Sequence, residues 1–345
     1  MREKNSLPLV SIIITNYNGL NHLTLCLPSI VKQDYPSIEV ILVDNHSSDK
    51  SVSFVKKNYP RVVIIKQSKN HGYAQGNNIG YSHAKGSYIM ILNNDTVLET
   101  NLVSQLLTAF TSIPKLGAVQ PKVKLMNNPH TLDSCGSYWT NTGFNYHVGN
   151  YKNEELPIYN RPFPVYSLKG VCMMIPRTVI EKVGLFDKDF WCYFEETDFC
   201  HRVWLAGYEC WYYPKTSLLH ALGGTRLKKS EAFIQFHSFK NRLCSYLKNL
   251  GTKEMIVVVP WYLLLTFIWG LYRLMNRDFS YFASVYRALY WNVINISSTL
   301  KKREYIQKKL RKLSDGILFR RIRKEPRISY YVMLVKGLQY YTDAI

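Results

Sequence analysis

Short runs of aliphatic and β-branched residues recur through the first hundred positions, separated by longer segments of mixed polarity. Four such runs are Leu9–Thr15, Glu39–Val43, Val62–Ile65 and Ser87–Leu92. An unbroken apolar run of this length is typical of a strand that is buried on both faces. The segments between the runs favour helices, one ending near Gln33 and another near residues 74–84. Alternating strands and helices predict an α/β domain with a mostly parallel sheet.

Polar residues stand where three of these strands end. Thr15-Asn16-Tyr17 follows the first strand, Asp44-Asn45 the second, and Asn93-Asn94-Asp95 the fourth. Ligands bind at the carboxyl ends of the strands in such sheets, so these segments predict one shared crevice. Each also has a structural interpretation. Asp44 could cap the following helix, Asn93–Asp95 could be a turn, and the glycines of Asn70–Gly80 could satisfy positive φ angles.

A second polar cluster lies about a hundred residues further on. Glu195, Glu196 and Asp198 fall within four residues. The aromatic residues around them are Phe190, Trp191, Tyr193, Phe194 and Phe199. An aromatic wall desolvates a carboxylate and raises its proton affinity, which is how a protein makes a general base. The same residues could instead be the acidic first turn of an amphipathic helix that runs to about Ala206.

Composition indicates a folded protein. The 345 residues are 47% hydrophobic and 20% charged, enough for one large domain with an appendage. Seven cysteines form no C-x-x-C pair, and the polar residues 1–6 lack the apolar core of a leader, so we expect a reducing cytoplasm. No G-x-G-x-x-G follows the first strand and no Walker A motif is present, which argues against dinucleotide and P-loop sites.

The formal charge of +20 is concentrated towards the C-terminus. Residues 251–345 hold 17 Lys and Arg against 6 Asp and Glu, whereas residues 1–250 hold 27 against 18. A basic protein attracts polyanions such as nucleic acid, an anionic membrane surface or phosphorylated small molecules.

The strand-end motifs together resemble family 2 glycosyltransferases of the GT-A fold, particularly bacterial rhamnosyltransferase-like members. The matching segments occur in the family's order and are Val10–Asn18, Val43–Asp49, Asn70–Asn78, Leu92–Asp95 and Tyr193–Asp198. The resemblance implies a GT-A nucleotide-diphospho-sugar transferase fold, with a mostly parallel mixed sheet flanked by helices. It would cover residues 1–225, divided into a nucleotide-sugar half (1–125) and an acceptor half (126–225). Residues 226–345 would then be a helical, membrane-associating extension.

The resemblance also implies roles for individual residues. The set matching the family's nucleotide site is Thr15, Asn16, Tyr17, Asp44, Asn77 and Asn94. Asp95 corresponds to the last residue of the family's D-x-D element, which coordinates a divalent cation, Mg²⁺ or Mn²⁺, and His220 to a late histidine near that metal. Asn93 replaces the first carboxylate, which suggests weaker metal affinity.

The carboxylate cluster matches the family's catalytic base. Glu196 occupies the base position, where relatives usually carry Asp, and Glu195 or Asp198 could take part. Lys169 and Gly170 are expected beside the acceptor.

The implied reaction is inverting transfer of a sugar from a nucleotide-diphosphate sugar, dTDP-rhamnose or a UDP-sugar, to a hydroxyl of a glycan or lipid-linked acceptor in cell-surface polysaccharide synthesis. The alternatives are a sugar nucleotidyltransferase, although its Gly-rich, Lys/Arg-containing loop is absent, and a non-catalytic basic module that binds nucleic acid or acts as a scaffold.

The tail predicts association with a membrane. An amphipathic helix is expected over residues 226–249, followed by 17 uncharged residues, Ile256–Tyr272. As a helix this run is about 25 Å long, short of the roughly 30 Å hydrocarbon core. A span would also carry 16 Lys and Arg against 5 acids across the membrane, against the positive-inside rule for a cytoplasmic catalytic domain.

We therefore expect a peripheral or monotopic protein on the cytoplasmic face of the cell membrane. The apolar run would be a re-entrant or interfacial anchor, and the basic tail would lie on anionic headgroups. Nucleic acid is the less favoured partner of the basic run at 301–327 because aromatic and aliphatic residues surround it. The tail could also be a solvated helical hairpin that packs on the catalytic domain.

Overall fold

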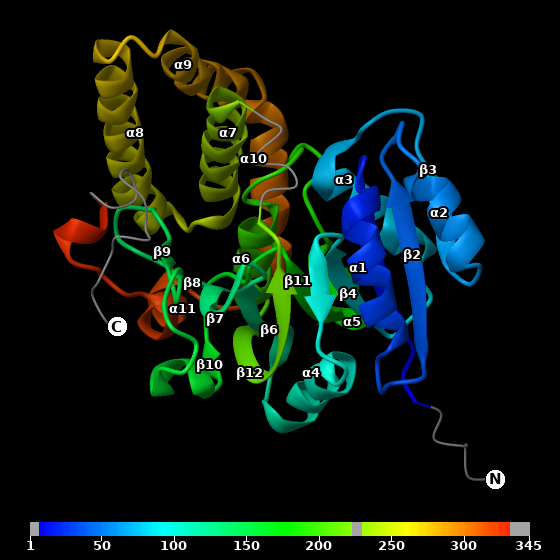
Figure 1. Cartoon of the computed structure of the whole chain (residues 1–345). Coiled ribbons are helices and arrows are strands. Elements are labelled where there is room, and N and C mark those ends of the chain that lie inside the picture. The colour runs from blue at the N-terminus through cyan, green and yellow to red at the C-terminus, as the bar shows by residue number, and fades with distance from the viewer. Residues whose placement is uncertain (1–6, 223–229, 332–345) are drawn as a thin grey trace.

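The computed structural model describes residues 7–222 and 230–331 (Figure 1). The strands are β1 Val10–Asn16, β2 Ile38–Asp44, β3 Val63–Lys66, β4 Tyr88–Asn93, β5 Thr96–Leu98, β6 Leu116–Leu125, β7 Asn128–Ser134, β8 Ser137–Tyr138, β9 Tyr146–His147, β10 Phe163–Pro164, β11 Cys172–Pro176 and β12 Glu209–His220. The helices of the sheet region are α1 Leu20–Val31, α2 Ser51–Asn58, α3 Gly72–His83, α4 Leu102–Ser112, the short η1 Pro157–Asn160, α5 Arg177–Val183 and α6 Glu195–Leu205.

A ten-stranded sheet organises the N-terminal two thirds of the chain. Its main order is β10-β12-β6-β11-β4-β1-β2-β3, with β5 on β12 and β7 on β6. The strands β4, β1, β2 and β3 are mutually parallel, whereas β11 runs antiparallel to both β4 and β6. The predicted mixed, mostly parallel α/β sheet is therefore confirmed, and the four apolar runs form β1 to β4.

Helices cover both faces of this sheet, as Figure 1 shows. On β1, Ile12 and Ile14 pack with α1 and α4 on one face, and Ile13 packs with α3 on the other. All three side chains are fully buried. The apolar runs are unbroken because every position along the central strands faces one of two cores.

Strand β12 is longer than the sequence pattern indicates. The sequence Cys210–Tyr213 predicts a short strand, with His220 in the segment that follows it. Instead β12 runs from Glu209 to His220, parallel to β6, and its last residues pair with β5. His220 is therefore held at the end of a strand, opposite Thr96.

The C-terminal part is helical and returns to the sheet region. Its elements are α7 Glu231–Asn249, α8 Thr252–Met275, α9 Phe279–Ile294, α10 Ile296–Tyr305, η3 Ile306–Leu310 and α11 Asp315–Ile322. Lys302 of α10 forms ion pairs of 2.6 Å with Asp187 and Asp189, and the backbone NH of Trp139 donates to Ile322 at 2.9 Å. One continuous hydrophobic core joins both parts.

Helix α8 exceeds the length that the uncharged run suggests. It has 24 residues, so it is about 36 Å long, and its most apolar part has a mean hydropathy of 1.9 with 22% of that part buried. A helix of this length can cross a membrane. The length of about 25 Å expected from the 17 uncharged residues is therefore corrected, and length no longer argues against a span. The return of α10 and α11 to the sheet region is the stronger argument against a single span, since both sides of α8 stay attached to one body.

Candidate active site

The strand ends meet as the sequence predicts. Asn16 is paired with Asp44 across β1 and β2, and Thr15 with Asn93 across β1 and β4. The amide of Asn16 joins these segments: its Nδ2 donates to Ser51 Oγ at 3.0 Å, and its Oδ1 accepts from Asn94 Nδ2 at 2.8 Å. Asn16 and Asn94 therefore fix the edge of the sheet.

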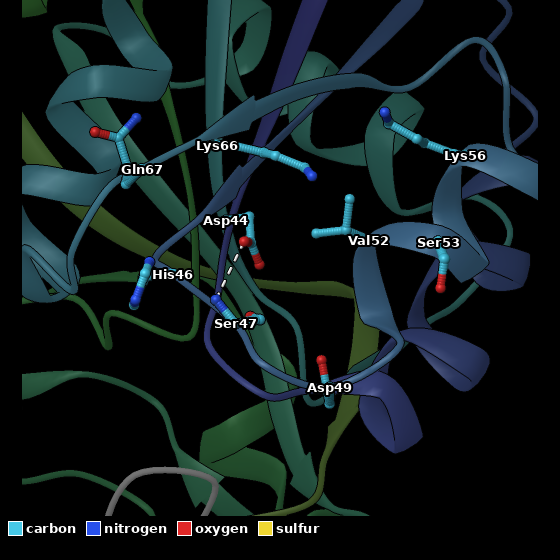
Figure 2. A pocket seen from close by; sticks show the side chains of 9 residues that line it. All are labelled: Asp44, His46, Ser47, Asp49, Val52, Ser53, Lys56, Lys66 and Gln67. Atoms are coloured by element: carbon cyan, nitrogen blue, oxygen red, sulfur yellow. Dashed lines mark hydrogen bonds between the residues drawn. The ribbon is translucent and has the colours of Figure 1, made fainter.

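A cavity of about 470 Å³ opens beside Asp44 (Figure 2). It is lined by Asp44, His46, Ser47, Asp49, Val52, Ser53, Lys56, Lys66 and Gln67. The Asp44 carboxylate is buried and held in place by the backbone NH of Ser47 at 3.2 Å and, more weakly, by Asn16 Nδ2 at 3.4 Å. An acceptor group with a fixed orientation thus faces a cavity that also contains two lysines.

The loops after β1 and β2 are bound to each other above this cavity. Asn18 (φ 49°) and His46 (φ 68°) both adopt left-handed backbone conformations. The Asn18 side chain accepts from the backbone NH of Ser48 at 2.7 Å, while the side chain of Tyr17 stays 45% exposed. The two turns are therefore one rigid unit, with Tyr17 available to a ligand.

Two residues predicted to bind the nucleotide, Thr15 and Asn77, do not line the cavity but take part in the packing of α3. Asn77 is fully buried, and its Nδ2 donates to the backbone oxygen of Tyr73 at 2.9 Å. The methyl group of Thr15 lies so close to Gly76 that a side chain there would meet it at 2.7 Å. In the described structure these residues position α3 against β1.

Asp95 lies at one end of a chain of charges. His220 Nε2 is 3.4 Å from Asp95 Oδ1, and His220 Nδ1 is 2.9 Å from Asp133 Oδ2. Asp133 is in turn 3.6 Å from Lys169 Nζ. Burial opposes the charge on His220, but hydrogen bonds with Asp133 and Asp95 outweigh it and raise the pKa of His220 to about 9. Burial opposes the charge on both carboxylates, but Lys169 and then His220 lower the pKa of Asp133 to about 2, and His220 lowers that of Asp95.

The donor set suits a metal that takes most of its ligands from a substrate. Within residues 7–222 and 230–331, no three His, Cys, Asp or Glu side chains are arranged to hold a metal ion. Among the described residues, buried Asp95 Oδ1 has only the long 3.4 Å contact with His220 Nε2, so it retains the capacity to bind a hard cation. Mg²⁺ typically binds one or two carboxylates together with substrate phosphates. The Asp133 contact on Nδ1 also leaves His220 Nε2 facing Asp95, which is how carboxylates commonly orient a histidine ligand. Residues 223–229, which include the glycine pair after His220, lie outside the described residues.

Glu195 and Glu196 begin α6, after Tyr193 and Phe194 in left-handed conformations. Glu195 is buried, and its Oε2 has no hydrogen-bond partner. Burial and the neighbouring charge of Glu196 raise the pKa of Glu195 well above its usual value. Burial also raises the pKa of Glu196, although backbone hydrogen bonds and the charges of Lys169 and Arg242 oppose this. Glu195 therefore holds its proton more strongly, and Glu196 is the easier of the two to ionise.

Gly170 lies directly beside this pair. A Cβ atom placed on Gly170 would be 3.8 Å from Glu196 and 3.7 Å from the hydroxyl of Tyr73. The Tyr73 hydroxyl donates to the backbone oxygen of Gly170 at 2.5 Å. Lys169 and Gly170 are thus next to the predicted base, and Lys169 connects it to the Asp95 chain.

Asp198 occupies a different environment from its two neighbours. It is fully buried and contacts Arg202 at 3.2 Å, Lys248 at 3.1 Å and the amide of Asn249 at 2.8 Å. Burial opposes its charge, but Lys248 and Arg202 outweigh burial and lower its pKa. A carboxylate so fully paired does not accept a substrate proton, so the geometry favours a structural role for Asp198.

Three residues of this site have no signal in the sequence pattern. Asp133 on β7, His147 on β9 and Arg242 on α7 approach Lys169 or the glutamate pair from remote segments. Desolvation by the protein atoms around His147, followed by the charges of Lys169 and Arg242, lowers its pKa to about 3, although its side chain is exposed. Asp133 and His147 stand in the region whose loops carry no periodicity, and Arg242 is one of several cations on its helix.

This mixed sheet, with a cavity at the carboxyl ends of β1 and β2 and a carboxylate pair across from it, has the architecture of GT-A glycosyltransferases. The chain belongs to glycosyl transferase family 2, whose family model matches residues 11–184, half of its length. The resemblance inferred from the motifs is confirmed.

Relatives with curated names support this assignment. A protein named as a glycosyltransferase from Rickettsia prowazekii is 25% identical over 274 residues, which cover 75% of this chain and 77% of the relative. An N-acetylglucosaminyl-diphospho-decaprenol L-rhamnosyltransferase from Mycobacterium tuberculosis is 24% identical over 239 residues, 61% of this chain and 76% of that protein.

Solved structures show the same fold. S. aureus TarS residues 1–349 align with a TM-score of 0.55 at 16% identity, covering 98% of this chain and 94% of that one. GalNAc-T7 with UDP, GalNAc and Mn²⁺ aligns with a TM-score of 0.57 at 17% identity, covering 70% of this chain but 49% of that one. At these identities the likeness concerns the fold.

Proposed function

We propose that this glycosyltransferase moves a sugar from a nucleotide-diphosphate sugar to a hydroxyl of a glycan or lipid-linked acceptor, with inversion at the anomeric carbon. The observation that carries the proposal is the link between the two halves of the site. Lys169 is 3.6 Å from Asp133, which binds His220 beside Asp95, and its charge also acts on Glu196. Lys169 therefore connects Asp95, the carboxylate proposed to bind the metal, with Glu196, the proposed base.

The cavity beside Asp44 is the proposed site of the donor's nucleoside. The Asp44 carboxylate can accept a hydrogen bond from the imide NH of uracil or thymine, and the exposed ring of Tyr17, in the turn after β1, is the surface proposed to lie against the base. Asn16 and Asn94 hold the cavity in shape. The rhamnosyl relative supports dTDP-rhamnose as one candidate donor, and a UDP-sugar is the other.

Asp95 is the residue that would hold a divalent cation, with His220 as a second ligand once it has lost its proton. Such an ion, when bound, neutralises charge on the nucleoside diphosphate. Mn²⁺ in two structures of the same fold, GalNAc-T7 and a mannosyltransferase from Pyrobaculum calidifontis, supports the choice of a divalent cation.

Glu196 is the proposed general base. Its carboxylate removes the proton from the acceptor hydroxyl as that oxygen attacks the anomeric carbon, and the nucleoside diphosphate leaves from the opposite face. A single base without a positioned nucleophile gives inversion, by the logic that separates inverting from retaining glycosidases. Burial and the charge of Glu196 raise the pKa of Glu195 further, so Glu195 is the less ready of the two to carry a negative charge beside the base.

The C-terminal helices support a peripheral or monotopic place on the cytoplasmic face of a membrane. The exposed apolar side chains of α8 are Ile256, Val257, Trp261, Leu264, Phe267, Ile268, Leu271, Tyr272 and Met275. Burial of such a surface in the headgroup boundary, together with attraction of the basic tail to anionic lipid, would hold the enzyme there. Flotation with anionic vesicles tests this: retention at high salt is expected, and release by salt alone would contradict an apolar anchor.

A thermal-shift screen tests the donor proposal. UDP, dTDP and GDP are added with and without Mn²⁺, and a ligand that binds the folded state must raise the melting temperature. We expect a shift with UDP or dTDP that increases with Mn²⁺. Transfer with release of nucleoside diphosphate completes the test, whereas release of pyrophosphate would indicate a nucleotidyltransferase.

A further inference from the structure

Two consecutive aromatic residues lead into α6 in a backbone conformation that favours glycine. Tyr193 has a φ of 65° and Phe194, the N-cap of α6, has a φ of 72°. A usual N-cap residue lies in extended backbone and accepts a hydrogen bond with its side chain, and Phe194 does neither. Such a conformation costs free energy and persists only where surrounding contacts enforce it. Because Glu195 and Glu196 follow at once, whatever holds this turn also determines where their carboxyl groups stand.

Asn241 of α7 holds the turn through its side-chain amide. Its Nδ2 donates to the backbone oxygen of Cys192 at 2.9 Å and to that of Tyr193 at 2.7 Å. Asn241 is fully buried, and both N–H groups of its amide are used on these two successive carbonyls. The carbonyl before them, that of Trp191, accepts from the backbone NH of Tyr73 in α3 at 2.7 Å. Three carbonyls in a row are therefore fixed, two of them by one side chain of α7.

Helix α7 is attached to α6 at a second point, beyond the glutamate pair. Asn249 Nδ2 donates to Asp198 Oδ1 at 2.8 Å, and Lys248 Nζ is 3.1 Å from Asp198 Oδ2. All three side chains are buried. Along the chain, Glu195 and Glu196 thus lie between two attachments to the same helix. A helix of the C-terminal part therefore fixes the start of α6 from both ends.

We propose that Asn241 is a positioning residue for the transfer reaction: by holding the left-handed turn before α6, it places the carboxylate of Glu196 against the acceptor hydroxyl. Asn241 acts through the backbone of Cys192 and Tyr193, not on the substrate. It lies beyond residues 11–184, the part of the chain that the family model matches. This inference rests on the proposed function, because Glu196 is the base proposed there.

A double-mutant cycle separates positioning of the base from general support of the fold. Asn241→Leu keeps a side chain of similar size and removes both N–H donors. The matched control is Asn292→Leu in α9, since Asn292 is also a buried amide whose Nδ2 donates to two backbone oxygens, those of Lys240 at 3.1 Å and Ala288 at 2.9 Å. Both substitutions are made in the full-length wild type and in Glu196→Gln.

Three quantities are measured for each variant. Turnover is the release of nucleoside diphosphate from dTDP-rhamnose or UDP-glucose, with Mn²⁺ present and octyl glucoside as the acceptor. The donor KM comes from the same assay. Amide hydrogen exchange over residues 190–198 reports the turn itself and does not depend on activity.

We expect Asn241→Leu to lower kcat about 10- to 100-fold, because misplacement of a reacting group by about 1 Å can cost 10²-fold, and to leave the donor KM within about threefold. In the Glu196→Gln background the same substitution should change kcat less than about threefold, since the group that Asn241 positions is already absent. Exchange over residues 190–198 should become faster. Asn292→Leu should match its parent in kcat and in this exchange, even where its melting temperature falls as far. Asn241→Ala enters the cycle if Asn241→Leu does not fold.

Two results would overturn the inference. One is unchanged kcat in the folded Asn241 variants, and the other is an equal loss of kcat in the wild-type and Glu196→Gln backgrounds, which would reduce Asn241 to support of the fold. Failure of the proposed function looks different, since the wild type would then release no nucleoside diphosphate. In that case hydrogen exchange still decides, because equal exchange over residues 190–198 in wild type and Asn241→Leu would show that Asn241 does not hold the turn.

Discussion

The pair Glu195 and Glu196 gives the sharpest test of the mechanism, because two adjacent carboxyl groups are predicted to behave oppositely. Glu196→Gln removes the proposed base with almost no change of shape. Positioned general bases contribute about 10²- to 10⁴-fold, so we expect a loss of that size in turnover with donor binding unchanged. Glu195→Gln replaces the carboxyl group whose pKa is raised further and which is therefore the less able of the two to act as a base, so turnover should stay within about threefold of the wild type.

The position of the carboxylate matters as much as its presence. Glu196→Asp moves it back by about 1.5 Å, the length of one carbon–carbon bond. Misplacement by about 1 Å can cost 10²-fold, so this variant should also be slow. Equal activity of Glu196→Asp and the wild type would mean that the acceptor pocket tolerates either length.

The pH dependence separates the two residues further. Activity should fall on the acid side with an apparent pKa above 4.5, since burial raises the pKa of Glu196 above that reference value. For Glu195, a raised pKa in the folded state stabilises the fold at low pH, and this stabilisation is lost as pH rises from 4.5 through the folded-state pKa. Glu195→Gln does not titrate, so its melting temperature relative to wild type should increase with pH.

Steady-state transfer and thermal unfolding between pH 5 and 9 provide the assays. The reasoning is refuted if Glu195→Gln abolishes transfer while Glu196→Gln retains it. It is also refuted if Glu195→Gln loses stability relative to wild type as pH rises.

Three further predictions follow from buried or closely packed groups. Burial lowers the pKa of His201 to about 4 from 6.5, so the stability that it contributes above pH 6.5 should fall by about 3 kcal/mol as pH drops to 4; urea unfolding should show a smaller loss in His201→Gln, and an equal loss would contradict this. Gly170→Ala fits 3.8 Å from Glu196, so its melting temperature should not change, whereas kcat/KM for the acceptor should fall about tenfold; unchanged kinetics would place the acceptor elsewhere. Asp44→Asn should weaken UDP or dTDP binding about tenfold in calorimetry, and unaltered affinity would remove Asp44 from the nucleoside site.

The sequence predicts that the strand-end residues of the proposed donor site meet, because their arrangement is local. Strands β1, β2 and β4 end at the polar motifs, and the parallel register then places Asn16 opposite Asp44 and Thr15 opposite Asn93. Knowledge of the sheet type is enough to bring these residues together. Asn77 shows the limit of this reasoning. Its motif is predicted at the crevice, but its side chain donates a hydrogen bond to the backbone of Tyr73 within α3.

The acceptor side is much less predictable because its contacts join distant segments. Asp133 reaches His220 from 87 positions away, and Asp198 meets Asn249 across 51. Nothing in the local pattern of β7 distinguishes Asp133 from a surface aspartate. The same holds for Arg242, whose charge acts on Glu196 only because α7 packs against α6.

The different roles of the three carboxylates at the start of α6 have a simple geometric cause. Successive residues of an α-helix are rotated by about 100°, so Glu196 and Asp198 point about 200° apart. Asp198 points to the core, where it pairs with Lys248 and Arg202. Glu196 therefore points away from the core. Glu195, 60° from Asp198, is turned towards the interior without a cation, which is why its proton is retained. Once α6 is known to be helical, its spacing alone separates Glu196 from Asp198, and the burial of each decides which one can act as a base.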